Sequence, residues 1–229
     1  MSASTSQPEV LRTSAGQFPL EEYRLRSGGR ELAVLHTGAI LTPEDESRFL
    51  FETTGRPPYG VALWPAAVAL AHDVVARSEA FHACRVLELG AGTGLPGIVA
   101  ASCGARVVQT DRHELAMFVC RGNGARNGIT TIEYRLADWT AWDDAERYDW
   151  ILGSDILYAQ RLHPHLRRIF ERNLAPGGRL LIADPFRAES LRLLQALEAG
   201  GWGVTLTKWN VGEDGAPRPV GVYELTPPR

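Results

Sequence analysis

The sequence predicts an α/β protein built on a doubly wound, mostly parallel sheet of seven strands with helices on both faces. Three observations predict this fold class. From residue 85 onward, short apolar segments alternate with helical segments, the pattern of parallel strands joined by crossover helices. The last two apolar segments have no helix between them, so we expect an antiparallel hairpin at the C-terminus. A glycine-rich segment, residues 90–94, separates the first strand of this series from the helix after it.

Residues 19–63 are expected to form an appendage of a β-hairpin and a helix on the edge of this core. Alternating polarity on both sides of Ser27-Gly28-Gly29-Arg30 predicts the hairpin. A short helix is expected to begin near residue 43, with Thr42 as its cap.

Three segments make up the predicted domain organisation. Residues 1–18 are rich in Ser, Thr, Gln and Pro and are expected to be a flexible tail. The appendage at 19–63 and the core at 64–229 then form a single domain, a usual size for one hydrophobic core.

Period-two and period-3.6 patterns place the elements of the core. The predicted strands are residues 85–89, 105–110, 131–136, 148–153, 179–183, 203–209 and 220–225. The predicted helices are residues 64–77, 95–102, 113–127, 162–173 and 188–199.

Composition argues against several classes of function. The formal net charge is -3 and no basic stripe with interleaved aromatics is present, so nucleic acid is not an expected partner. The longest apolar stretch, residues 61–71, is too short to cross a membrane. The N-terminus lacks an apolar signal core, and the three cysteines form no CxxC pair, which predicts a cytoplasmic protein. No metal is expected, because His163 and His165 flank a proline before a helix.

The segment Glu88-Leu89-Gly90-Ala91-Gly92-Thr93-Gly94 carries the first prediction of a binding site. Glycines let the backbone turn tightly and approach a ligand, and the ligand crevice of such a Rossmann-like sheet lies beyond the carboxyl ends of its strands. The next strand ends at Asp111, where a carboxylate can accept hydrogen bonds from ribose hydroxyls. We therefore expect a nucleoside-containing cofactor.

Two cofactors are compatible with this loop. Residues 92–97 formally match the G-x-G-x-x-G pattern of dinucleotide sites. The alternative register begins at Glu88, whose carboxylate at the strand tip is expected to meet the ammonium of S-adenosylmethionine. A pyrophosphate would be repelled there, so S-adenosylmethionine is the preferred prediction.

Four segments make the sequence resemble the class I, seven-strand S-adenosylmethionine-dependent methyltransferases. Within them it resembles the protein-lysine methyltransferase group described as nicotinamide-N-methylase-like. The four segments lie between about residues 60 and 186: Gly60-Val61-Ala62-Leu63-Trp64-Pro65-Ala66-Ala67, residues 86–97, Thr110-Asp111 and residues 148–158.

The resemblance implies roles for individual residues. It implies that Trp64 lines the donor pocket, that Gly90, Ala91 and Gly92 lie under the methionine moiety, and that Asp111 binds the ribose. It also implies a set of contacts near the adenine and the passing donor: Trp139 against the adenine with Trp142 as a competitor, Asp138 at the adenine amino group, and Ser154 at the end of the fourth core strand.

Asp155 and Tyr158 are the predicted catalytic residues. They follow the fourth core strand with an i to i+3 spacing, which puts both on one face if Asp155 opens a helical turn. Asp155 could hold an incoming amine by charge, and Tyr158 could wall the acceptor channel and orient it. Arg187 follows the fifth strand and is expected to face the same crevice.

The predicted function is methylation of a protein lysine side chain. A small amine such as nicotinamide is the close alternative acceptor. A dinucleotide-binding oxidoreductase or a non-catalytic donor-binding protein is a more distant alternative. The oxidoreductase would need a Tyr-x-x-x-Lys pair, and the only lysine of the chain is Lys208, in a late strand. The sequence predicts no oligomeric state.

Overall fold

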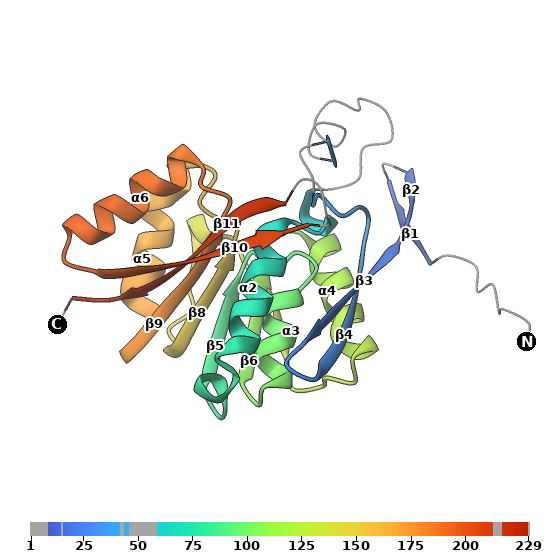
Figure 1. The fold of residues 1–229 in the computed structure, drawn as a ribbon, viewed down its shortest axis with the longest axis horizontal. Helices are drawn as coiled ribbons and strands as arrows, with labels where there is room; N and C mark the ends of the chain where they lie inside the picture. Colours follow the sequence, from blue (N-terminus) through green and yellow to red (C-terminus); the bar gives the residue numbers. More distant parts are fainter. Residues whose placement is uncertain (1–8, 15, 42–43, 46–58, 213–216, 229) are drawn as a thin grey trace, which may run out of the picture.

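The computed structural model describes residues 9–14, 16–41, 44–45, 59–212 and 217–228 (Figure 1). The helix predicted to begin near residue 43 lies mostly outside these described residues. Within the described part of the chain, no helix is both long enough and apolar enough to cross a membrane.

A seven-stranded sheet forms the centre of the molecule, which confirms the predicted fold class. Its order is β10-β11-β9-β8-β5-β6-β7. The pairings among β5 to β9 are parallel, whereas β11 pairs antiparallel with both β10 and β9. The strands are β5 (Arg85–Leu89), β6 (Arg106–Asp111), β7 (Glu133–Leu136), β8 (Tyr148–Ser154), β9 (Leu174–Asp184), β10 (Gly203–Val211) and β11 (Arg218–Thr226).

Helices cover both faces of this sheet. One hydrophobic cluster joins α2 and α3 to the sheet, and a second cluster joins α5 and α6 to the opposite face (Figure 1). The α-helices are α2 (Pro65–Ala76), α3 (Leu95–Ser102), α4 (Glu114–Arg126), α5 (His163–Asn173) and α6 (Ala188–Ala199). Short 3₁₀ turns are η1 (Tyr59–Val61), η2 (Ser78–Phe81), η3 (Trp139–Ala141) and η4 (Gln160–Leu162). Because β5 is flanked by β6 and β8, the chain reverses its winding direction beside β5, where doubly wound sheets form their ligand crevice.

Strand β9 begins earlier than predicted. The sequence analysis expected a turn at residues 176–178 and a strand from 179, but β9 already starts at Leu174. Tyr148 pairs with Leu174 and Trp150 with Arg179, so the register shifts between these two pairs. The extra residues are accommodated as a bulge in which Gly177 has a φ of +77°. The sequence analysis interpreted this glycine as part of a turn, whereas in the structure it allows a bulge within the strand.

The predicted N-terminal hairpin is confirmed as β3 (Glu21–Ser27) and β4 (Arg30–His36). Gly28 and Gly29 have positive φ angles, as a two-residue hairpin turn requires. Asn123 of α4 and Asn127, the residue directly after this helix, bind the other edge of β4. Asn123 Oδ1 accepts from Leu35 N at 2.8 Å and Asn127 Oδ1 accepts from Ala33 N at 2.9 Å, and each side-chain amide donates back to the carbonyl of the same residue. The edge of β4 is thereby satisfied by side chains.

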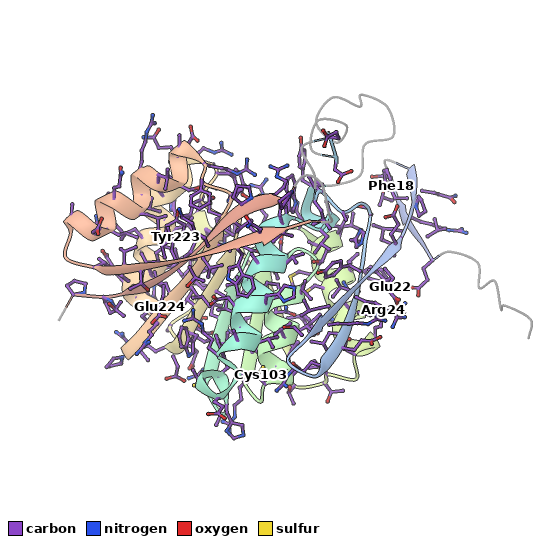
Figure 2. All side chains as sticks on the ribbon, in the orientation of Figure 1. Phe18, Glu22, Arg24, Cys103, Tyr223 and Glu224 are labelled. Carbon is purple, nitrogen blue, oxygen red and sulfur yellow. The ribbon has the colours of Figure 1, made fainter. Side chains whose placement is uncertain are left out.

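Part of the segment predicted as a flexible tail forms a second hairpin, β1 (Val10–Thr13) and β2 (Gly16–Pro19). Leu11 and Phe18 are buried against α4 in a small cluster, and Figure 2 labels Phe18 on this hairpin. The segment is polar overall, but burial of these two apolar side chains stabilises the packing of the hairpin against α4. The segment before residue 9 lies outside the described residues.

Candidate active site

A cavity of about 790 Å³ opens at the carboxyl ends of the central strands. Its volume is in the range of small-molecule sites. Ten predicted site residues line it: Trp64, Gly90, Ala91, Gly92, Asp111, Asp138, Trp139, Ser154, Asp155 and Tyr158. Arg187 also lines it, as expected. The sequence analysis missed other lining residues, among them Tyr59, Arg112 and His113. The position of Arg112 and His113 directly after Asp111 was the available signal.

The glycine loop forms one wall of the cavity with its backbone. Gly90, Gly92 and Gly94 have φ angles of +65°, +55° and +82°, a region that side-chain-bearing residues rarely adopt. A Cβ at Gly90 would lie 3.0 Å from Ile156 Cγ2 and 3.3 Å from Trp139 Cζ2. The loop therefore requires glycine at position 90, both for its turn and for the space beside Trp139.

Asp111 is held in place by the same loop. Its Oδ2 accepts from Gly92 N at 3.2 Å and its Oδ1 accepts from His113 N at 2.9 Å. The residue is 7% exposed and lines the cavity. A carboxylate has about four lone-pair sites, so two remain for ligand hydroxyls. The carboxylate thus has both the position and the remaining acceptor capacity that a ribose site needs.

Glu88 does not line the cavity, which argues against the predicted direct contact of its carboxylate with the donor ammonium. It is 1% exposed, and its Oε2 accepts from Gly97 N at 3.1 Å and from Gln109 Nε2 at 2.6 Å. Alternation along β5 explains this orientation: Leu87 and Leu89 face one side of the sheet, and Glu88 faces α3 on the other side.

The environment of Glu88 also changes its charge. Burial raises the pKa of its carboxyl to about 8, although the hydrogen bonds from Gln109 and Gly97 oppose that rise. Its Oε1 is buried and has no hydrogen-bond partner among the described residues. A carboxyl that is mostly protonated near pH 7 would not repel a pyrophosphate. The preference for S-adenosylmethionine over a dinucleotide therefore cannot depend on the charge of Glu88.

Trp139 and Asp138 form the side of the cavity that follows β7. Asp138 Oδ1 accepts from Thr140 N and Thr140 Oγ1, both at 2.8 Å, and the backbone hydrogen bond leads in lowering the pKa of this carboxyl. Asp138 is therefore a cap of η3 as well as a cavity residue. The competitor Trp142 lies elsewhere, because its Nε1 donates to Asn173 Oδ1 at 2.9 Å and it does not line the large cavity.

Trp64 lines the cavity where the appendage joins the core. Its indole stacks on Tyr59 with ring centroids 6.2 Å apart, and its Nε1 donates to Tyr59 O at 3.2 Å. It also precedes Pro65, the first residue of α2. Two aromatic rings therefore close this wall of the cavity.

Asp155 and Tyr158 lie at the end of β8, but without the predicted helical turn. Residues 155–159 are irregular, and Asp155 has a φ of +54°. Both oxygens of its carboxylate accept from the guanidinium of Arg187, at 2.8 Å each. Tyr158 is 51% exposed at the rim. The carboxylate that was expected to hold an amine is thus already paired with a cation.

Within the described residues, no group of three or more His, Cys, Asp and Glu side chains could hold a metal ion. His163 is engaged with Leu157 O at 2.9 Å through its Nε2.

Comparisons with known proteins identify the family of the chain. The family model described as lysine methyltransferase matches residues 44–196. A protein N-lysine methyltransferase of Xenopus tropicalis, METTL21A, is 39% identical over 136 residues, which cover 56% of this chain and 62% of that protein. A histone-arginine methyltransferase of Xenopus laevis, METTL23, is 38% identical over 106 residues, covering 44% of this chain and 45% of that protein. The chain thus matches less than two thirds of the length of these relatives.

A solved structure supports the fold alone. The N-methyltransferase NodS of Bradyrhizobium japonicum, in complex with S-adenosyl-L-homocysteine, superposes with a TM-score of 0.56 at 16% identity. The match covers 80% of this chain and 96% of that one.

Proposed function

The chain belongs to the lysine methyltransferase family, and we propose that it transfers a methyl group from S-adenosylmethionine to a lysine side chain of a protein. The observation that carries the proposal is the cavity itself. A glycine-loop wall with Asp111 lines it, and so do Asp155 and Tyr158 from the end of the neighbouring strand β8. The cavity thus combines a nucleoside-binding region with a polar acceptor region at the carboxyl ends of adjacent strands.

The space and the polar groups of the donor half support S-adenosylmethionine as its ligand. Gly90 leaves the space that a Cβ would fill beside Trp139. Asp111 would accept from the ribose hydroxyls, and Trp139 would pack against the adenine. Asp138 would accept from the adenine amino group with the oxygen that is not used by Thr140.

The reaction needs positioning more than acid or base catalysis. When bound, S-adenosylmethionine supplies a methyl group that passes to the lone pair of a deprotonated lysine nitrogen, while the electron pair of the broken S–C bond stays on sulfur and a proton leaves to solvent. The chain's residues orient the two reactants. Tyr158 would wall the channel of the acceptor, and Ser154, at the end of β8, would border the donor.

Other acceptors remain alternatives to a protein lysine. The METTL21A relative is named a protein N-lysine methyltransferase, which supports a protein acceptor over a small amine. The METTL23 relative is named a histone-arginine methyltransferase, so arginine is the second candidate side chain. Membership of the lysine methyltransferase family disfavours a dinucleotide-binding oxidoreductase. Repulsion of a pyrophosphate by Glu88 does not add to this argument, because Glu88 is buried away from the cavity.

The predicted cytoplasmic location remains part of the proposal. It depends on the three cysteines, Cys84, Cys103 and Cys120, all of which are free thiols. Cys103 and Cys120 are buried, and free thiols are typical of reducing compartments. Cell fractionation with an antibody against the protein would test this location.

Calorimetric titration with S-adenosylmethionine and, separately, with NAD tests the proposed donor. We expect micromolar binding of S-adenosylmethionine and a loss of about ten-fold or more in Asp111→Asn, which keeps one acceptor oxygen for the loop. Asp143→Asn, an exposed residue outside the cavity, is the control and should bind as the parent does. Binding of NAD without binding of S-adenosylmethionine would refute the proposal.

A further inference from the structure

The acceptor half of the cavity contains a two-pronged ion pair. Arg187 Nε donates to Asp155 Oδ1 and Arg187 Nη2 donates to Asp155 Oδ2, each at 2.8 Å. The Asp155 side chain is 10% exposed and that of Arg187 is 31% exposed, and both line the cavity. Such a fork is the strongest common geometry between guanidinium and carboxylate.

The fold holds both partners rigidly. Asp155 follows β8 and Arg187 follows the neighbouring strand β9, and Asp155 N donates to Ala183 O at 2.8 Å. Arg187 N donates to Asp184 Oδ1 at 2.7 Å, and the other oxygen of Asp184 accepts from Ser190 Oγ at 2.5 Å.

Backbone strain accompanies the pair. Asp155 has a φ of +54° and Phe186, the residue before Arg187, has a φ of +63°. Left-handed conformations of residues other than glycine persist only when the surroundings impose them, and they cluster at functional sites. The chain thus adopts an unfavourable backbone conformation just after each of the two strands, close to the point where the two side chains meet.

An unpaired carboxylate beside an acceptor amine would stabilise the ammonium form and so oppose methyl transfer. Opposite charges within about 4–6 Å favour the charged form of a group, and a lysine amine is already mostly protonated near pH 7 because its pKa is about 10.4. The guanidinium on Asp155 cancels most of this attraction. The net charge that the pair presents to the nitrogen of an acceptor is therefore close to zero.

We propose that Arg187 is a specificity-determining residue of the acceptor site. By occupying both oxygens of Asp155, it prevents that carboxylate from holding the acceptor as a cation, so that the site selects an uncharged amine. The proposal rests on the proposed function. The same pairing disfavours an arginine side chain as the acceptor. Both oxygens of Asp155, which could accept two hydrogen bonds from the guanidinium of a substrate, already accept from Arg187.

Other charged or titratable groups face the pair or share its cavity. Asp184 lies beneath it, at the start of the turn into α6, and is held by Ser190 and the Arg187 backbone. Tyr158 lies at the rim beyond β8. The remaining groups line the cavity on the donor side: Asp111, Arg112, His113 and Asp138. All of them are unchanged in the variants below.

The test measures binding of n-butylamine, as a stand-in for the lysine side chain, to the protein saturated with S-adenosyl-L-homocysteine. Calorimetry at about pH 8 and about pH 9 distinguishes the two forms of the amine, since the uncharged fraction rises about ten-fold per pH unit below its pKa. The parent, which selects the uncharged form, should bind about ten-fold tighter at the higher pH. Arg187→Gln should bind the cation and change by less than about two-fold.

Two further variants complete the test. The double variant Asp155→Asn with Arg187→Gln has neither charge and should regain the pH dependence of the parent; Asn also tolerates the left-handed backbone at 155. Arg192→Gln, on the exposed face of α6, is the matched control and should behave as the parent does. n-Butylguanidine should bind Arg187→Gln at least about ten-fold tighter than the parent.

The outcomes separate this inference from the proposed function. If S-adenosyl-L-homocysteine does not bind the parent, the proposed function fails. If S-adenosyl-L-homocysteine binds every variant but the n-butylamine affinity of Arg187→Gln keeps the parental pH dependence, Arg187 has only a structural role and the inference is overturned. Absence of n-butylamine binding to all forms would equally overturn it, because the pair would then not border an amine site.

Discussion

The two halves of the cavity are built in different ways. In the donor half, the wall from the glycine loop at residue 90 to Asp111 comes from one stretch of chain and presents backbone and one carboxylate, and the segment after β7 adds Asp138 and Trp139. The acceptor half joins Asp155 to Arg187, which are 32 residues apart, from the ends of two neighbouring strands. A backbone site is encoded by local residue types, whereas a side-chain pair depends on strand order.

Backbone conformation shows the same contrast. Left-handed residues in the donor loop are glycines, Gly90, Gly92 and Gly94, which adopt that conformation at little cost. The left-handed residues in the acceptor half are Asp155 and Phe186, for which it is unfavourable. We infer that the donor half follows from local sequence, whereas the acceptor half is imposed by the surrounding fold. Four predictions test this contrast.

The largest expected effect is a pH dependence of stability that originates under the donor loop. The carboxyl of Glu88 has a pKa of about 8 in the fold, against 4.5 for an ordinary glutamate. Between these values the folded state keeps a proton that the unfolded state releases, so the free energy of unfolding should fall as pH rises from about 4.5 to about 8. The expected loss is on the order of 4 kcal/mol.

Chemical denaturation at several pH values of the parent and of Glu88→Gln measures this effect. The variant has no proton to lose at this position, so its stability curve should be flatter through the same interval and should lie above the parental one at the alkaline end. Glu79→Gln, at an exposed glutamate, is the control. Equal slopes for the parent and Glu88→Gln would contradict a neutral Glu88.

The next effect concerns the shape of the donor loop. Gly90→Ala places a methyl group 3.0 Å from Ile156 Cγ2 at a φ of +65°. We expect donor affinity to fall about 100-fold, because the loop must shift or Trp139 must move. Gly122→Ala, in α4 with open space around it, should leave affinity unchanged and stabilise the helix by up to about 1 kcal/mol. Unaltered donor binding in Gly90→Ala would show that the loop is not the donor wall.

A smaller effect is expected where the appendage meets the donor loop. The Asn123 amide binds Leu35 and also donates to Thr93 O at 2.9 Å. Asn123→Ala should lower the free energy of unfolding by about 2 kcal/mol and also weaken donor binding. Asn127→Ala removes contacts with Ala33 but none with the loop, so it should lower stability alone.

Denaturation curves and donor titrations of the two asparagine variants would distinguish these effects. A single transition in Asn127→Ala would support the proposal that residues 19–229 form one domain. Separate unfolding of the hairpin would argue against that proposal. Equal losses of donor affinity in both variants would show that Asn123 has no special role at the loop.

The smallest effect is expected at the exposed rim of the acceptor half. Tyr158 is 51% exposed, so Tyr158→Phe should change the KM for a lysine-containing peptide by less than about three-fold, whereas Tyr158→Ala should raise it about ten-fold through loss of the ring. Donor affinity should not change in either variant. A loss of donor affinity in Tyr158→Ala would remove the division between the two halves.

Most of the core elements could be predicted from local pattern. Strand β5 has the predicted bounds, 85–89, and the helices differ from prediction by about one residue at their ends. The larger differences occur where composition and tertiary contact conflict. Residues 10–18 look polar, yet Leu11 and Phe18 dock on α4, and a Pro-Gly-Gly segment became a bulge in β9 instead of a turn.

Local sequence was therefore sufficient for the fold class, the glycine loop, Asp111 and the set of residues at the strand ends. Their determinants are short-range: hydrophobic period, glycine conformations and the position of an acid after a strand. Tertiary packing was required for the face of β5 to which Glu88 points, for the neutral charge that burial gives it, and for the pairing of Asp155 with Arg187. Each of these depends on which elements become neighbours in space, and contacts between distant segments leave no local pattern.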